Sequence, residues 1–157
     1  AKDYPNKIIE LKYIVESDTM EGKIEGKFRT HNILMLDPGT ELQYVLDVAK
    51  ESFNDPSVHS VFHKAHTIFV NAVMGFTPHF NEGTIALDQL IDDNPNGVKL
   101  YGGGDTLQEL KRLLPGLYIS AIDSPQYYIF TGGGAVLKAI QEGTPFKMKP
   151  IEAISES

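Results

Sequence analysis

The chain has 157 residues, 41% of them apolar and 22% charged, which is typical of a globular protein with one core. A formal net charge of -7, without a cluster of Lys and Arg, argues against nucleic acid or an anionic membrane as a partner. The absence of cysteine excludes disulfides and thiolate chemistry. No signal peptide or apolar run of transmembrane length occurs, so we expect a cytoplasmic protein. Because the chain opens on Ala1 and enters a strand pattern within a few residues, we expect one domain cut from a longer protein.

The first third of the chain predicts a strand, a hairpin and a helix. An apolar, β-branched run predicts a buried strand over Lys7–Val15. Glycine turns precede Lys27–His31, which we expect to pair with Ile33–Leu36 as a small surface hairpin. A turn at Asp37-Pro38-Gly39 then breaks the chain, and Thr40 is expected to cap a helix. The apolar positions of that helix are Leu42, Val45, Leu46, Ala49 and Phe53.

A second helix is expected to start at Pro56, because proline is favoured at the first position of a helix. Its apolar face would consist of Val58, Val61, Phe62 and Ala65, with His59, His63 and His66 on the opposite stripe. Three histidines at this spacing suggest a metal site, but neither cysteine nor a carboxylate cluster accompanies them. We therefore predict a solvated helix face.

The rest of the chain alternates between strand and helix patterns. Strands are expected at Thr67–Val70, Val98–Tyr101 and Tyr127–Phe130, and helices at Thr84–Ile91, after Thr106, and at Ala135–Gln141. A turn is expected at Asn94–Gly97, and Leu117–Ile122 fits either a strand or a tight connection. These elements predict a three-layer α/β fold with a mostly parallel, Rossmann-like sheet that includes Lys7–Val15. The strands lack polar alternation, so we expect both of their faces to be buried.

Two of the predicted strands end in glycine triplets that lead into helices. The sequences are Gly102-Gly103-Gly104-Asp105-Thr106 and Thr131-Gly132-Gly133-Gly134-Ala135. Glycine allows a ligand to approach the backbone, and the N–H groups and dipole at a helix N-terminus favour phosphate. Alternatively, Thr106 caps the helix and forms a capping box with Glu109. A cap requires no glycine triplet, so the glycines themselves favour phosphate binding.

Neither of the common phosphate motifs fits, because the triplets lack the Gly-Lys-Ser/Thr of a P-loop and Leu137 stands where the dinucleotide fingerprint needs glycine. Over almost its whole length the chain instead resembles the C-terminal, nucleotide-binding domain of phosphoglycerate kinases. Segments that match in the family's order are Leu36–Gly39 with an Asp-Ile-Gly-Pro-Lys turn, Thr67–Gly75 with a strand and an Asn-Gly-Pro-Met-Gly loop, Gly102–Thr106 with Gly-Gly-Gly-Asp-Ser/Thr, Thr131–Ala135 with Ser-Thr-Gly-Gly-Gly-Ala, and Glu142-Gly143 and Pro150–Ala153 with the closing segment.

This resemblance implies reversible phosphoryl transfer between ATP and 3-phosphoglycerate in glycolysis, with magnesium. It assigns Asp105 to the magnesium of the nucleotide, and it places Thr106 and Asn71 at the phosphates. The implied phosphate-binding set is completed by Gly102, Gly103, Gly104 and Thr131. The implied catalytic group is the backbone of Gly132, Gly133 and Gly134, at the N-terminus of a helix directed at the phosphoryl group in transfer.

Departures from the family pattern predict weak nucleotide binding. The family's phosphate-binding lysine falls at Glu41, and its ribose-binding glutamate falls at Pro78, which has no acceptor side chain. Val73 replaces a proline and Phe130 a serine. Nothing matches the N-terminal domain that binds 3-phosphoglycerate, so we expect the isolated chain to be inactive. A non-catalytic module that binds a small phosphate ligand or a protein partner, and an unrelated α/β domain whose glycines serve packing, are the alternatives.

Overall fold

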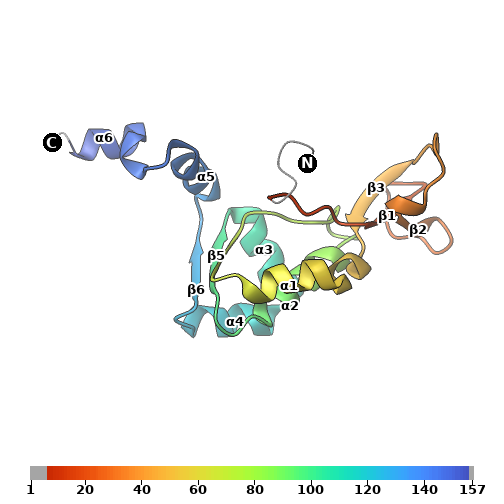
Figure 1. Ribbon diagram of the computed structural model, residues 1–157, viewed down its shortest axis with the longest axis horizontal. Helices are drawn as coiled ribbons and strands as arrows, with labels where there is room; N and C mark the ends of the chain where they lie inside the picture. The colour runs from red at the N-terminus through yellow and green to blue at the C-terminus, as the bar shows by residue number, and fades with distance from the viewer. Residues whose placement is uncertain (1–6, 156–157) are drawn as a thin grey trace. The chain divides into compact units, whose positions relative to one another are not determined.

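A computed structural model describes residues 7–155, apart from the side chains of Pro150 and Ser155. The start of the chain at Ala1 lies outside these residues. Contacts divide the chain into two compact units (Figure 1). The first unit extends to Ala65 and also contains Met74–Gly97, and the second contains His66–Val73 and the chain from Val98 onward. That the whole chain forms one domain stays a prediction.

The first unit is built on an antiparallel sheet with strand order β2-β1-β3. The strands are β1 (Tyr13–Ser17), β2 (Phe28–Asn32) and β3 (Tyr44–Val48). A small core of buried side chains lies against this sheet, and its members are Val15, Leu46, Ala49 and Phe80. The rings of Phe28 and Phe80 meet edge to face, with centroids 6.5 Å apart, which is a favourable aromatic geometry.

The position of the first strand differs from the sequence-based prediction. Ile8 and Ile9 are 48% and 45% exposed, and the strand begins only at Tyr13, within an antiparallel sheet. Its end is fixed by a buried polar side chain, Glu16. The Glu16 carboxylate accepts hydrogen bonds from the Gln43 N–H at 2.6 Å and from Arg29 Nε at 2.9 Å, and the first of these lowers its pKa. The apolar run therefore predicted a strand, but polar pairing decides where it lies.

The hairpin and the helix expected between residues 27 and 53 are both wrong. Ile33–Met35 forms a short 3-10 turn, η1, because the side chain of Asn32 accepts the Leu34 N–H at 3.0 Å and bends the chain. β2 pairs with β1 instead. The expected helix is replaced by β3 and a 3-10 segment, η2 (Lys50–Asn54). Backbone pairing of β3 with β1 overrides the helical spacing of its apolar residues.

The two helices of the first unit agree with the sequence. α1 (Pro56–Lys64) starts at Pro56, where Asp55 accepts the Ser57 N–H at 2.9 Å, and α2 (Glu82–Asp92) covers the predicted segment. Val61, expected on the apolar face of α1, is 50% exposed. His59 and His63 lie exposed on α1, and His66 lies beyond its end.

A buried amide, Asn94, holds the end of α1. Its Nδ2 donates to the carbonyl oxygens of Phe62 and Ala65, both at 2.8 Å. Its Oδ1 accepts the N–H groups of Asn96 and Gly97, at 2.9 and 2.8 Å. The predicted turn at 94–97 is therefore confirmed, and one side chain joins it to the last carbonyls of a helix, which otherwise lack partners.

The second unit contains a parallel sheet with strand order β4-β5-β6. The strands are β4 (Thr67–Val70), β5 (Val98–Gly102) and β6 (Tyr127–Phe130). The helices are α3 (Gly104–Leu113), α4 (Pro115–Asp123), α5 (Gly133–Glu142) and α6 (Lys149–Ser155), the last preceded by the 3-10 turn η3 (Pro145–Lys147). The predicted α/β fold with parallel strands is confirmed, and the segment at 117–122 is helical.

Burial of this sheet is one-sided, contrary to the prediction. Ile68, Val70 and Tyr101 are at most 8% exposed and point to one face. Leu100 and Tyr128 are register partners on the opposite face, and Tyr128 is 56% exposed. Among the described residues, no helix has the length and apolar character needed to cross a membrane.

A buried acid gives the first unit a testable dependence on pH. Asp47 of β3 is 4% exposed and accepts the Gly83 N–H in the first turn of α2, at 3.2 Å. Burial raises the pKa of Asp47, so the folded state disfavours its charged form. Protonated Asp47 therefore adds to the unfolding free energy. This contribution is complete below the usual carboxyl pKa range, and it is lost as the pH rises through the raised pKa of Asp47.

We therefore expect Asp47→Asn to gain unfolding free energy relative to wild type between about pH 3 and pH 7. Urea unfolding followed by circular dichroism measures the difference at each pH. Asp37→Asn, at an exposed position, is the control. If the stability of Asp47→Asn relative to wild type fell with rising pH, that result would contradict a raised pKa of Asp47.

Candidate functional site

The carboxyl ends of the three parallel strands bring the predicted site residues of the second unit together. Val70 of β4 pairs with Tyr101 of β5, and Gly102 pairs with Phe130 of β6. Asn71, Gly103 and Thr131 each follow directly on one of these strands. The two glycine turns, taken here as residues 102–106 and 131–135, therefore lie at one edge of the sheet next to Asn71.

The amide side chain of Asn71 lies between the two glycine turns. A Cβ atom on Gly103 would stand 2.5 Å from Asn71 Oδ1, and a Cβ atom on Gly133 would stand 2.5 Å from the same oxygen. No real side chain fits at that distance, so both positions need glycine for packing. Gly103 also has φ +106° and Gly132 has φ +49°, which are conformations that favour glycine.

The remaining glycines of the helix starts face open space. A Cβ atom on Gly104 or Gly134 would meet no atom within 4 Å, and both residues are exposed. Gly104 is the first residue of α3, and Gly134 the second of α5. Glycine is a poor helix residue, by up to about 1 kcal/mol, and packing gives no reason for it at these two positions. Open space in front of helix N–H groups suits the approach of an anion.

The alternative interpretation of Thr106 and Glu109 as a capping box is wrong. Gly103 occupies the N-cap position of α3, and its N–H donates to the carbonyl oxygen of Phe130 at 3.2 Å. Thr106 is buried within the first turn, and its hydroxyl donates to the Ala72 carbonyl oxygen at 3.5 Å. Glu109 instead pairs with Arg112, at 2.6 Å. The N–H groups of the first turn of α3 therefore have no side-chain cap.

A pocket of about 260 Å³ opens at this helix start. It is lined by Asn71, Ala72, Val73, Gly103, Gly104, Asp105 and Thr106. Asp105 is exposed and is the only carboxylate among these lining residues. Magnesium bound with a nucleotide commonly takes one or two protein carboxylates and phosphate oxygens. One carboxylate beside backbone N–H groups therefore fits magnesium that arrives bound to a nucleotide. The described residues contain no cluster of three His, Cys, Asp or Glu that would hold a metal ion in the absence of a nucleotide.

The second glycine turn has the same character at the start of α5. Thr131 is exposed at the end of β6. The Ala135 and Val136 N–H groups donate to the Gly132 carbonyl oxygen, at 2.9 and 3.2 Å. The N–H groups of Gly133 and Gly134 precede them, in the first turn where intrahelical acceptors are lacking. All the residues that the sequence predicted for the phosphate site are therefore brought to one edge, with Thr106 turned toward Ala72.

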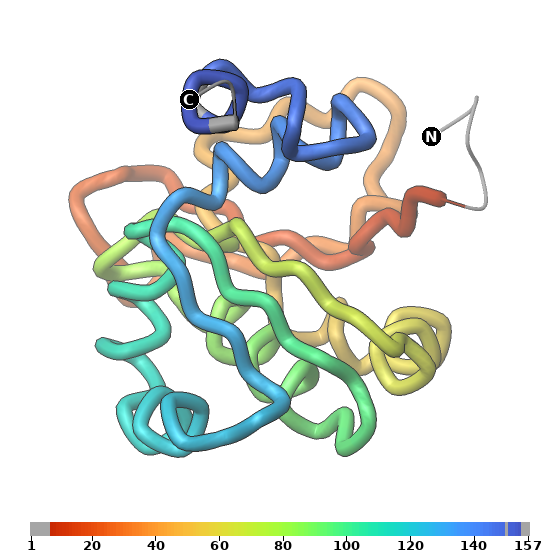
Figure 2. The backbone as a smooth tube through the Cα atoms, turned by 90° about the vertical axis from the view of Figure 1, so that its left-hand side faces the viewer, coloured from red at the N-terminus to blue at the C-terminus, as the bar shows by residue number. Residues whose placement is uncertain are grey.

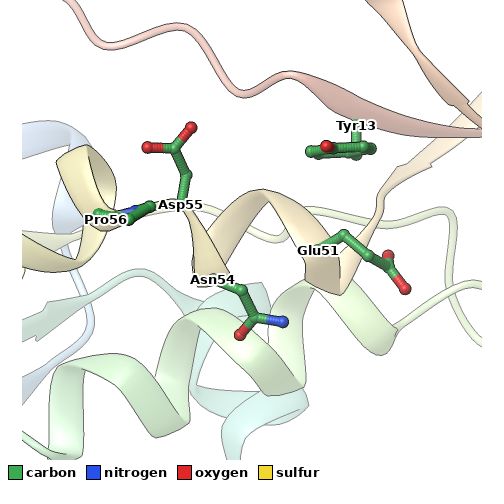
Figure 3. Close-up of a pocket in the computed structure, with 5 residues that line it drawn as sticks. All are labelled: Tyr13, Glu51, Asn54, Asp55 and Pro56. Atoms are coloured by element: carbon green, nitrogen blue, oxygen red, sulfur yellow. The ribbon is translucent and has the colours of Figure 1, made fainter.

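A larger pocket, in the first unit, suits phosphate less well. It measures about 380 Å³ and is lined by Tyr13, Glu51, Asn54, Asp55 and Pro56 (Figure 3). Two of these five side chains are carboxylates, which repel phosphate. A hydrogen bond from Lys12 holds the pKa of Asp55 well below its usual range, so this carboxylate is ionised and already paired.

Two of the four departures from the family pattern, Glu41 and Pro78, belong to the first unit. Glu41 lies exposed in the loop before β3, so the helix start predicted around it is wrong. The strand, turn and helical segment expected around Glu41 occur instead at β3, Ala49 and η2. Asp47 lies near the end of this strand, and Lys50 is the first residue of the helical segment. The signal was present in the sequence, because Asp47-Val48-Ala49-Lys50 matches an Asp-Ile-Gly-Pro-Lys turn with one residue fewer. Pro78 is exposed.

Comparison with known proteins identifies the family. The profile of the family "Phosphoglycerate kinase" matches residues 5–143, which is most of the chain. The chain belongs to the phosphoglycerate kinase family. A phosphoglycerate kinase of Thermus thermophilus is 34% identical over 82 residues, which cover 51% of this chain and 19% of that protein. The enzyme of Acidobacterium capsulatum is 35% identical over 94 residues, which cover 59% of this chain and 21% of that protein.

A solved structure supports the fold. The phosphoglycerate kinase from Coxiella burnetii matches with a TM-score of 0.61 and 21% identity, over 85% of this chain and 31% of that one. The chain thus spans about a fifth of the length of the curated kinases and about a third of the solved one.

The contrast between Gly133 and Gly134 gives a test of the site geometry. We expect Gly133→Ala to lower the unfolding free energy by about 1–3 kcal/mol, because the methyl group would overlap Asn71. Gly134→Ala is the matched control one residue away, and it should raise the stability by up to about 1 kcal/mol. Denaturant unfolding of both variants measures the two effects. Equal stability of the two variants would show that Asn71 does not hold the turns.

Proposed function

We propose that the edge formed by Asn71 and the two glycine turns binds the phosphate groups of magnesium ATP or ADP, as part of a phosphoglycerate kinase. One observation carries the proposal: two helix N-termini without side-chain caps, α3 and α5, start from adjacent strands, and each has one glycine, Gly104 or Gly134, that packing does not require. Membership of the family supports phosphoglycerate kinase-like chemistry. Transfer of phosphate between ATP and 3-phosphoglycerate is the reaction we infer.

Each residue has a defined part in this proposal. The N–H groups at the start of α3 bind phosphate oxygens, and Asp105 orients the nucleotide through its metal. A bound magnesium ion supplies positive charge to the phosphate oxygens. The N–H groups of Gly133 and Gly134 hold the phosphoryl group in transfer, whose charge needs stabilisation more than covalent chemistry.

An alternative is a module that binds a small phosphate ligand or a protein partner without catalysis. The exposed Pro78 favours it, because a side chain without an acceptor offers nothing to ribose hydroxyls. The chain also spans only about a fifth of its curated relatives, so we expect the isolated chain to be inactive as a kinase. Binding of inorganic phosphate with no preference for nucleotide would favour this alternative.

Substitution of the acid tests the proposed metal role. We expect Asp105→Asn to weaken the binding of magnesium ADP at least tenfold, about 1.4 kcal/mol, since the variant loses an oxygen charge that faces the metal. Binding of metal-free ADP should stay within a factor of about two or tighten, because a negative charge near phosphate is removed. Titration calorimetry with and without magnesium measures both. Asp123→Asn, exposed at the end of α4, is the control, and equal effects with and without magnesium would exclude the metal role.

The effects of the departures at Glu41 and Pro78 can be separated by a pair of variants. Pro78→Glu supplies an acceptor at the family's ribose position, so we expect it to tighten magnesium ATP binding severalfold. Glu41→Lys lies in an exposed loop before β3 and not at the start of a helix, so we expect it to change affinity less than twofold. Calorimetry on both variants measures which of them has the larger effect on the affinity for magnesium ATP. A larger gain for Glu41→Lys would restore Glu41 as the counterpart of the family's lysine.

A further inference from the structure

The turn between α2 and β5 contains the one Asn-Gly sequence of the chain, Asn96-Gly97. Figure 2 shows this turn in green, as the link between the two elements. In an Asn-Gly sequence the backbone nitrogen of the glycine can attack the side-chain amide of the asparagine, because a residue without a Cβ atom leaves the approach open. Asparagine is therefore among the residues that limit the chemical lifetime of a protein. The proposed nucleotide site makes no use of this turn.

Packing requires glycine at position 97. A Cβ atom on Gly97 would stand 2.7 Å from Asn94 Nδ2 and 2.8 Å from the Ala65 carbonyl oxygen. The carbonyl belongs to the backbone, and the side chain of Asn94 is fixed at 1% exposure, so neither atom moves aside at little cost. The amide that holds the end of α1 thus imposes the glycine that makes Asn96 reactive.

The backbone nitrogen of Gly97 is held back from this reaction. Its N–H donates to Asn94 Oδ1 at 2.8 Å, in a buried hydrogen bond. The N–H of Asn96 donates to the same oxygen at 2.9 Å, so one acceptor fixes the peptide groups on both sides of the Asn96 Cα atom. Attack requires the glycine nitrogen to lose its proton and to turn toward the side chain of Asn96, which is exposed. The electrophile is therefore open to solvent, whereas the nucleophile is not.

We propose that Asn96 is a deamidation site that the folded chain protects through Asn94. When the hydrogen bond to Asn94 opens, hydroxide removes the N–H proton of Gly97, and the nitrogen attacks Cγ of Asn96. The bond between Cγ and Nδ2 breaks, and Nδ2 takes protons from water and leaves as ammonia. Water then hydrolyses the succinimide to aspartate or isoaspartate. One asparagine and one water thus give one acidic residue and one ammonia, without an oxidant or a reductant.

The reaction changes the turn irreversibly. Aspartate adds a negative charge at the exposed position 96, and isoaspartate adds a methylene group to the main chain between the N–H groups of residues 96 and 97. A main chain that is longer by one atom no longer presents both N–H groups to Asn94 Oδ1. The altered turn leads directly into β5, which begins at Val98. Deamidation would therefore record the age of the molecule at the start of a strand.

Peptide mapping by mass spectrometry tests this protection on the full chain at mildly alkaline pH. We expect residue 96 to deamidate at least tenfold more slowly in the folded chain than in the chain unfolded by guanidinium chloride, because the reaction needs an opening of the turn. Asn94→Ala should raise the rate in the folded chain at least tenfold, since Gly97 loses its acceptor. Asn94→Asp keeps an oxygen for both N–H groups, so its rate should stay within about threefold of wild type.

Val58→Ala is the matched control for loss of stability. Val58 of α1 is 2% exposed, so its truncation destabilises the same unit without removing any hydrogen bond of the turn. We expect Val58→Ala to deamidate at least fivefold more slowly than Asn94→Ala, because only the latter frees the Gly97 nitrogen in the folded chain. Circular dichroism verifies that each variant is folded.

Three outcomes would overturn the proposal. One is a folded wild type that deamidates as fast as the unfolded chain. Another is a rate in Val58→Ala equal to that in Asn94→Ala, because unfolding of the whole unit would then control the reaction. The third is rapid deamidation of folded Asn94→Asp, which also decides the matter if Asn94→Ala does not fold. None of these measurements involves a nucleotide, so failure here is distinct from failure of the phosphate site.

Discussion

Parallel pairing of β4, β5 and β6 is the constraint on which the candidate site depends. In a parallel sheet all the carboxyl ends meet at one edge, so three chain segments far apart in sequence deliver their turns to the same place. The polar and glycine residues that follow each strand become neighbours without any direct pairing between them. The packing of Asn71 against two glycines is a result of that register. A shift of one strand by one residue would move its turn away from the edge and turn its side chains to the other face.

The first unit depends on a different kind of interaction, because its sheet contains buried polar groups. Glu16 and Asp47 are both at most 4% exposed, and each accepts backbone N–H groups from a distant segment. Such bonds fix a strand against its neighbours more specifically than apolar contact does, since an unmet acceptor in the interior is costly. Burial raises the pKa of Asp47, whereas the hydrogen bond from the Gln43 N–H lowers the pKa of Glu16, so the stability of this unit depends on pH.

The sequence predicted the second unit well and the first unit poorly, for identifiable physical reasons. The elements at 67–70, 98–102 and 127–130 have short apolar runs, and the last two lead into glycine triplets, so local pattern and tertiary role agree. Residues 42–53 have apolar spacing that suits a helix, yet pairing with β1 makes them a strand and a 3-10 segment. The site residues followed from the glycine triplets and the family resemblance. The role of Asn71 as a spacer did not, because contact between turns in different segments leaves no local pattern.

The position of Asn71 has a consequence for how the two turns tolerate mutation. A side chain added at Gly103 or at Gly133 meets the same amide oxygen, so any shift of the amide that relieves one position acts on the other. Substitutions at these two glycines are therefore not independent, and their energetic effects should not add, as is usual for residues with a shared neighbour. Sequence change in one turn is tied to the other through a single amide. The two turns therefore respond to mutation as one unit, although about thirty residues separate them in the chain.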